Sequence, residues 1–215
     1  SDLGNVHGII VLNVYNERLL RLLAETQIPK VFLDTSSLVA PDELNGDLLL
    51  MESRTSVRRI TCHLLEQGRT LPGFIGDISY AQSNRERYEG FCQALADAGK
   101  KVDSSLCLTT PLGIDTYREE IDTFLSSLSR MPDAFVCASD YVACILMQLL
   151  EKRGLRVPED VAVSGFDNNT EDLLAEHLTT VQVFNEELGA RLALQILYRI
   201  KYPNTPHEIT YLGTN

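Results

Sequence analysis

Polar side chains follow several short apolar runs of this chain, each at the point where a strand would end. Carboxylates and amides at such places accept hydrogen bonds from a hydroxylated ligand. Asn and Asp are also common turn residues, so simple chain reversal is the alternative interpretation. The residues at these ends are Asn13, Asp34, Asp77, Ser139 with Asp140, and Asp167 with Asn168.

The elements that must position these residues alternate between short β runs and amphipathic helices. Strands are predicted over 8–13, 30–34, 46–51, 71–76, 105–110, 133–138, 161–166, 178–183 and 207–212. Helices are predicted over 17–26, 55–68, 84–99, 117–128, 139–154, 170–177 and 186–200. Pro72 suits an edge strand or the first residues of a strand. This alternation predicts parallel sheets with helices on both faces, and such sheets bind ligands beyond their carboxyl strand ends.

Composition narrows the function classes. The chain has 44% hydrophobic and 23% charged residues, which is typical of a globular domain. No apolar run is long enough to span a membrane. The net charge of -11 argues against direct nucleic-acid binding by this segment. The five cysteines form no C-x-x-C pair, which favours a reducing compartment without disulfides or zinc.

Motifs of common enzyme classes are missing from the sequence. It contains no G-x-S-x-G, no G-x-x-x-x-G-K-[ST] and no G-x-G-x-x-G. The four histidines lie far apart along the chain, without zinc-ligand spacing. We therefore expect a protein that is not an enzyme and that uses neither a metal nor a cofactor.

Four stretches together resemble one known family. They are "LRVPEDVAVSGFDN" followed by "LTTV", "VHGIIVLN", "RERYEGFCQALADAG" and "DAFVCASDYVACILMQLLEKRG". In their order and spacing along the chain they resemble the effector-binding core of lactose/galactose-repressor (LacI/GalR) transcription regulators, from Val6 to the end of the chain. The resemblance implies an α/β fold of two lobes, like type I periplasmic binding proteins, with a sugar-like effector bound between them. It also implies a cytoplasmic homodimer that binds operator DNA through a helix–turn–helix not present in this chain.

The same resemblance implies a division of the chain. The first lobe would comprise 1–51 plus 185–205, and the second lobe 52–183 plus 206–215. The family has two further β–α units before "VHGIIVLN", so we expect an incomplete first sheet with an unpaired edge.

Two residues are the main candidates for effector binding. Asp167 matches the family's Asp that bonds sugar hydroxyls, and its alternative role is to cap the helix that follows. Arg87 matches the Arg of the family's R-x-x-G-[FW] motif, and its guanidinium offers several donors in fixed geometry. The alternative is that Arg85 has this role.

Four further candidates complete the predicted site. Asp34 matches a position that often contacts effector, although it would also suit a loop cap. Ser139 stands where many relatives have Asn, and Asp140 beside it is expected to cap the helix. Tyr80 is a candidate stacking ring, because Pro111 and Leu112 lie where some relatives place an aromatic side chain; Asn13 also belongs to the set.

The resulting prediction is the ligand-sensing domain of a bacterial transcription regulator. The alternative is a periplasmic sugar-binding protein of a transporter, which has the same fold. A core that binds no ligand is a third option, because Ser139 and the missing ring depart from the family pattern. The sequence does not define the effector, nor whether it induces or co-represses.

Overall fold

The computed structural model describes residues 5–113, 115–168 and 178–215, which form two α/β units. Of these residues, the first unit contains 5–52, Tyr80–Ser83 and Phe184–Thr214, and the second unit contains Ser53–Ser79, 84–113, 115–168, 178–183 and Asn215. Every strand pair in both units is parallel, which confirms the predicted fold class.

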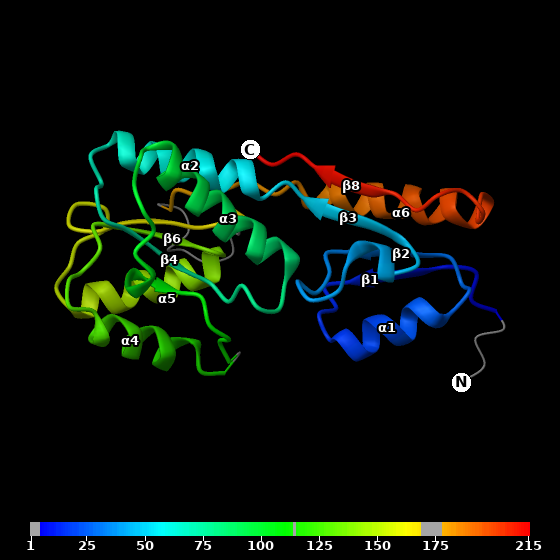
Figure 1. Cartoon of the computed structure of the whole chain (residues 1–215), viewed down its shortest axis with the longest axis horizontal. Helices are drawn as coiled ribbons and strands as arrows, with labels where there is room; N and C mark the ends of the chain where they lie inside the picture. The colour runs from blue at the N-terminus through cyan, green and yellow to red at the C-terminus, as the bar shows by residue number, and fades with distance from the viewer. Residues whose placement is uncertain (1–4, 114, 169–177) are drawn as a thin grey trace. The chain divides into compact units, whose positions relative to one another are not determined.

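The first unit is built on a four-stranded sheet in the order β1-β2-β3-β8. Its strands are β1 (Ile9–Leu12), β2 (Lys30–Leu33), β3 (Asp47–Met51) and β8 (Ile209–Leu212). Figure 1 shows β8, in red, alongside β3. This differs from the sequence-based division, which assigned 206–215 to the second lobe. The backbone N–H of Glu208 bonds to Asp47 at 2.9 Å and aligns β8 with β3.

Alternating side chains give the first sheet two apolar faces. Val31 and Leu33 lie on the face covered by α6 (Asn185–Lys201), where Leu188, Leu192 and Ile196 are buried. Phe32 lies on the opposite face, against Leu20 of α1 (Glu17–Glu25). The period of two along each strand thus matches the helical stripe on each side. Asn16 starts α1 by accepting the backbone N–H of Leu19 at 3.0 Å.

The second unit is built on a sheet in the order β5-β4-β6-β7. Its strands are β5 (Cys107–Leu108), β4 (Pro72–Ile75), β6 (Ala134–Cys137) and β7 (Ala162–Ser164). Pro72 begins a central strand, so of the two predicted places for it the first-residue position is the observed one. β5 is shorter than the predicted 105–110 strand because the short 3-10 helix η2 (Ser104–Leu106) occupies part of that range.

Two pairs of helices cover the two faces of the second sheet (Figure 1). On one face, α4 (Tyr117–Ser127) and α5 (Asp140–Lys152) bury Ile121 and Leu146 against Phe135. On the other lie α2 (Arg54–Glu66) and α3 (Gln82–Asp97), where Phe91 packs at 5.6 Å from the ring of Phe74. A 3-10 turn, η1 (Pro41–Glu43), precedes β3 in the first unit.

The predicted strand over 178–183 is wrong. This segment makes only isolated parallel bridges, Ser164 with Thr179 and Asp167 with Gln182. Its polar side chains form hydrogen bonds around the end of β7 instead, between Thr180 and Asp140 and between Gln182 and Asn168. The predicted helix over 170–177, which Asp167, Asn169 or Thr170 would cap, lies outside the described residues.

Candidate functional site

Backbone geometry explains part of the polar pattern at the strand ends. Asn13, Asp34, Asp167 and Asn168 have φ values of 51°, 59°, 112° and 51°. Among residues with a side chain beyond Cβ, Asn and Asp tolerate positive φ best. Turn geometry therefore accounts for the residue types here, and a ligand role must rest on what the side chains contact.

Several polar residues at the strand ends of the second unit form one cluster: Asp77, Arg87, Ser139, Asp140, Asp167 and Asn168. Arg87 is its central cation. It starts from α3 and is only 5% exposed. Its guanidinium lies 3.7 Å from the centroid of the Phe166 ring and donates to the backbone carbonyl of Ala138. Its Nη2 lies 3.8 Å from Oδ1 of Asp167, a separation at which charges attract without a direct hydrogen bond. The cation is thus fixed next to the carboxylate predicted to bind ligand.

Asp167 is held in an unusual electrostatic state. Burial raises its pKa to about 6, the nearby Arg87 charge opposes that rise, and the charge of Asp140 adds to it. Even so, 43% of the side chain surface is exposed, so the carboxyl remains accessible to a ligand. The backbone N–H of Asp167 donates to Val181 at 3.0 Å. The positive φ is thereby kept in place by the 178–183 segment.

Ser139 and Asp140 have structural partners of their own. Ser139 is the N-cap of α5, since its hydroxyl accepts the N–H of Val142 at 3.3 Å. Asp140 is the first helical residue, and its Oδ1 accepts the hydroxyl of Thr180 at 2.6 Å. A Cβ on Gly165 would lie 2.1 Å from that same Oδ1, so only glycine allows the close approach.

Two more polar groups extend the second unit's cluster. The Asn168 side chain donates to the amide oxygen of Gln182, and its backbone N–H reaches the Thr180 hydroxyl at 3.3 Å. Asp77, at the end of β4, accepts from Ser79 N–H at 2.7 Å and from Leu112 N–H at 3.3 Å. Asp77 therefore fixes the loop that carries Pro111 and Leu112.

Asp34 organises a separate cluster in the first unit. It is 3% exposed. One carboxylate oxygen accepts the N–H groups of Thr35 and Ser83 at 2.8 and 3.3 Å. The other accepts the hydroxyls of Ser83 and Tyr15 at 2.5 and 3.1 Å. Because protein donors already occupy both oxygens, the geometry favours Asp34 as a group that positions Tyr15 and Ser83.

Tyr15 links the other two candidates of this unit. Its hydroxyl lies 3.4 Å from the amide oxygen of Asn13, and its ring packs edge-on against Tyr80, with centroids 4.9 Å apart. Tyr80 is 37% exposed. Sequence reasoning did not single out Tyr15 or Ser83. The position of Tyr15 two residues after a strand end was the available signal for it, whereas the contact of Ser83 with Asp34 joins distant segments.

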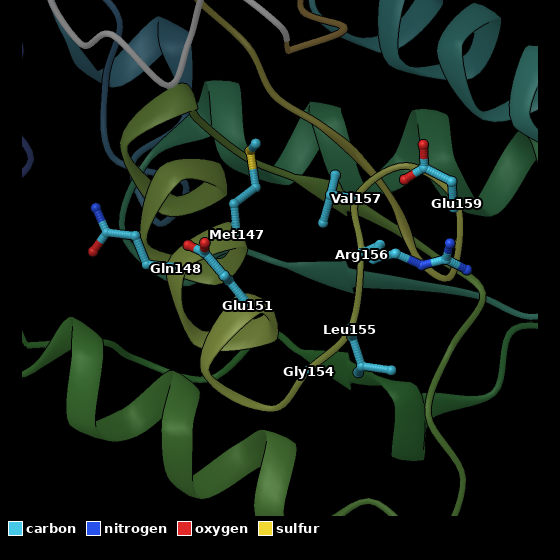
Figure 2. A pocket seen from close by; sticks show the side chains of 8 residues that line it. All are labelled: Met147, Gln148, Glu151, Gly154, Leu155, Arg156, Val157 and Glu159. Atoms are coloured by element: carbon cyan, nitrogen blue, oxygen red, sulfur yellow. The ribbon is translucent and has the colours of Figure 1, made fainter.

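A cavity of about 460 Å³ lies elsewhere in the second unit, between α5 and the segment 154–159. Figure 2 shows Met147 and Val157 at its wall, with Glu151 on the helix and Glu159 across from it. α5 begins at the strand-end cluster and runs roughly 1.5 Å per residue away from it, so this cavity lies at the far end of the helix. It contains none of the predicted site residues.

The described residues also limit the other classes of site. No group of three or more His, Cys, Asp or Glu side chains within this part of the chain is placed to hold a metal ion. The described helices include none that is long and apolar enough to cross a membrane. The two polar clusters thus present hydroxyl, amide, carboxylate and guanidinium groups beside aromatic rings, a combination suited to binding a hydroxylated molecule.

Comparisons with known proteins agree with this class of ligand-binding α/β protein. Residues 61–215 match the family described as periplasmic binding protein-like domain. The chain belongs to this family, in the form found as the effector-binding domain of LacI/GalR regulators.

Named relatives are transcription regulators. The repressor PurR of Actinobacillus pleuropneumoniae is 29% identical over 94% of this chain and 60% of its own length. The regulator DegA of Bacillus subtilis is 31% identical over 78% of this chain and 48% of its own length. The chain thus spans about 60% or less of these two relatives.

Solved structures extend the similarity over nearly the whole chain. The CelR–cellobiose complex has a TM-score of 0.85 and 27% identity, and covers 98% of this chain and 64% of the other. A LacI family regulator of Enterococcus faecium with bound ribose has a TM-score of 0.77 over 99% of this chain and 77% of the other. Its identity of 21% supports the fold alone.

Proposed function

We propose that the chain is the sugar-sensing domain of a bacterial transcription regulator, and that effector binding changes the regulator's affinity for operator DNA. A ligand that binds one conformation more tightly shifts the population toward it, and the coupling with operator binding is reciprocal. DNA binding would require a helix–turn–helix supplied by the rest of the protein. Such a regulator would act in the cytoplasm.

The observation that carries this proposal is the arrangement of Arg87, Phe166 and Asp167. An ionised carboxylate can accept from two neighbouring hydroxyls, and a guanidinium can donate to ring or hydroxyl oxygens. Arg87 is held by the Ala138 carbonyl and the Phe166 ring, while Asp167 retains accessible surface. A sugar offers the matching set of adjacent hydroxyls. Ser139 and Asn168 are further proposed contacts of this unit.

In the first unit we propose that Tyr80 and Asn13 contact effector. The exposed Tyr80 ring offers an apolar face on which a sugar can stack. Asn13 offers an exposed amide next to the Tyr15 hydroxyl. Asp34 would then act by holding Tyr15 and Ser83, and this makes its role in binding indirect.

Thermal unfolding against a panel of mono- and disaccharides tests the proposal. A ligand at about 100 times its dissociation constant stabilises the native state by roughly 2.7 kcal/mol, which shifts the midpoint by several degrees. We expect such a shift with at least one sugar. An intact, cooperative transition that no sugar shifts would contradict the proposal and favour a core without a sugar ligand.

We further propose that the full-length regulator is a homodimer, because helix–turn–helix proteins read two-fold symmetric operators as dimers. Light scattering on the full-length protein measures this directly. The relatives described above are transcription regulators, which favours a regulator over a transporter's sugar-binding protein. The relatives are named as regulators rather than as enzymes, and we propose no catalytic activity.

A further inference from the structure

A small basic pocket lies at the opposite end of the first sheet from Asp34. It has a volume of about 80 Å³ and is bounded by the turn 26–29, Asn45 and the segment around Pro203 and His207. Lys30 and Arg199 complete its lining. Lys30 begins β2 and Asp34 follows its end, so four residues, or about 13 Å of strand, separate the pocket from the strand-end cluster.

Lys30 is the unusual residue of this pocket because it is almost fully buried and has no ion-pair partner among the described residues. It is 2% exposed, and its Nζ donates to the backbone carbonyls of Thr26 at 2.9 Å and Asn45 at 3.1 Å. An ammonium has three N–H groups, so one donor has no protein acceptor within the described ranges. Burial lowers the pKa of Lys30. An uncompensated buried charge is costly, and this favours an anionic neighbour.

The nearby carboxylate does not supply that neighbour. Both oxygens of Asp47 accept from the Arg199 guanidinium, at 2.5 and 3.0 Å, and also from Gln195 and the N–H of Glu208. Arg199 donates its remaining N–H groups to the backbone carbonyls of Thr205 and Pro206 and to the Thr205 hydroxyl. Asp47 and Arg199 therefore neutralise each other, and the charge of Lys30 remains.

His207 adds a further donor at the exposed rim of the pocket. In the part of the chain that the structure describes, its ring has no hydrogen-bond partner. Its pKa is lowered, first by burial of the ring and then by the positive charge of Arg199, with Asp47 opposing and Lys30 adding to the effect. The pocket thus brings the Lys30 ammonium and the His207 ring together in a chain of net charge -11.

We propose that this pocket binds a small oxyanion, either inorganic phosphate or the phosphate group of a small ester, with Lys30 and His207 as the main donors. A buried water needs about 10–15 Å³ of such volume, so 80 Å³ suffices for a few waters or one compact anion. Water would satisfy the free N–H but not the charge. An oxyanion satisfies both, with charge-assisted hydrogen bonds that are about twice as strong as neutral ones.

Calorimetric titration and thermal unfolding with sodium phosphate, methyl phosphate and sodium sulfate test this proposal, against sodium chloride at equal ionic strength. We expect a saturable single-site response to phosphate that chloride does not give. Methyl phosphate distinguishes a phosphate ester from inorganic phosphate as the natural ligand. If methyl phosphate binds as tightly as inorganic phosphate, the site is assigned to esters, and if it binds more weakly, the site is assigned to the free ion. Lys30→Met should weaken binding at least about tenfold, as expected for loss of a charged hydrogen bond.

His207→Glu keeps the proposal testable if Lys30→Met does not fold, because His207 is exposed. Its carboxylate should abolish phosphate binding by repulsion, while the exposed Lys201→Met serves as a control that binds like the wild type. The absence of a saturable response to phosphate, or equal binding by His207→Glu and the wild type, would mean that the pocket holds only water. Either result leaves the sugar response at the strand ends unaffected, so the two proposals fail separately.

Discussion

The guanidinium of Arg87 lies over the ring of Phe166, 3.7 Å from the ring centroid. Phe166 is next to Asp167 in the chain, just after the end of β7. This contact holds the guanidinium over the ring, and Nη2 of Arg87 lies 3.8 Å from Oδ1 of Asp167. A flat cation on an aromatic face is a stacking arrangement that a lysine ammonium does not reproduce.

Arg87→Lys should therefore weaken sugar binding about tenfold or more, through loss of the planar donors. Arg85 is the matched comparison, because it was the alternative candidate and lies two residues away on the same helix. Arg85→Lys should leave the affinity unchanged. Calorimetric titration of both variants decides between the two arginines, and the reverse pattern would transfer the role to Arg85.

Effector binding should depend on pH through Asp167. Because its pKa is raised to about 6, the carboxylate is ionised at pH 7.5 and largely protonated at pH 5. The charge-assisted acceptor and the attraction to Arg87 are then lost, so sugar affinity should fall as the pH drops through 6. Titrations between pH 5 and 7.5 measure this. Asp167→Asn should bind more weakly and show a flatter profile; a wild-type affinity independent of pH would contradict the assignment.

The same shift predicts an effect of opposite sign on stability. The pKa of Asp167 is higher in the folded state than the ordinary aspartate value of 3.8, so the ionised carboxyl destabilises the fold, and does so fully above about pH 6. This penalty disappears as the pH falls from about 6 to 3.8. Asp167→Asn should therefore be as stable as the wild type or more stable at pH 7.5, with a smaller difference at pH 4. Denaturant unfolding at both pH values provides the comparison.

The buried pair of Asp47 and Arg199 should be critical for the first unit. Arg199 is 2% and Asp47 0% exposed, so removing one partner leaves a buried charge without compensation. Arg199→Met should cost about 3–5 kcal/mol of unfolding free energy. Adding Asp47→Asn to this variant should recover part of the loss, because the uncompensated charge is then gone. Urea unfolding of the two single variants and the double variant forms the test, and strict additivity would refute this coupling.

Low pH should destabilise the fold through the pair of Asp47 and Arg199. Burial acts to raise the pKa of Asp47, but hydrogen bonds from Arg199, Gln195 and Glu208 N–H and the Arg199 charge outweigh it and lower the pKa. A lowered folded-state pKa gives stability that is present above the unfolded value and lost as the pH falls through the folded one. Asp47→Asn should weaken this part of the acid sensitivity.

Two helical glycines should respond in opposite directions to alanine. A Cβ on Gly90 would lie 2.2 Å from the backbone carbonyl oxygen of Arg54, so α3 would have to move away from α2. Gly90→Ala should cost at least about 1–3 kcal/mol. Gly189 in α6 has open space around it, and Gly189→Ala should stabilise by roughly 0.5–1 kcal/mol. Thermal melts of the pair check the contact between α2 and α3, and equal behaviour would contradict it.

The local sequence pattern predicted most of the helices and strands, because buried apolar residues recur along each of them at the period of its secondary structure. Val31 and Leu33 alternate with Phe32, and Leu188, Leu192 and Ile196 share one helix face, so strand and helix periods are visible in the letters. The partner of β8 is not visible in this way. A strand with alternating side chains suits the edge of either sheet. The position of β8 is set by its pairing with β3 and by the hydrogen bond from Glu208 N–H to Asp47.

The site was predictable only where it followed the strand ends. Asn13, Asp34 and Asp167 could be located from the parallel-sheet rule, although positive φ values are a sufficient reason for their residue types. Tyr15 and Ser83 join Asp34 through contacts between distant segments, which no local pattern encodes. Segment 178–183 has β-type residues, but its Thr180 hydroxyl bonds to Asp140 and its backbone forms only isolated bridges.

Calorimetric titration of the sugar that gives the largest thermal shift, into wild type, Asp167→Asn and Asp115→Asn, tests the central claim most directly. Asp115 is an exposed carboxylate of the same unit, outside the strand-end cluster, and serves as the matched control. We expect at least about a tenfold loss of affinity in Asp167→Asn and no change in Asp115→Asn. Equal affinity in all three proteins would contradict the claim that Asp167 binds the effector.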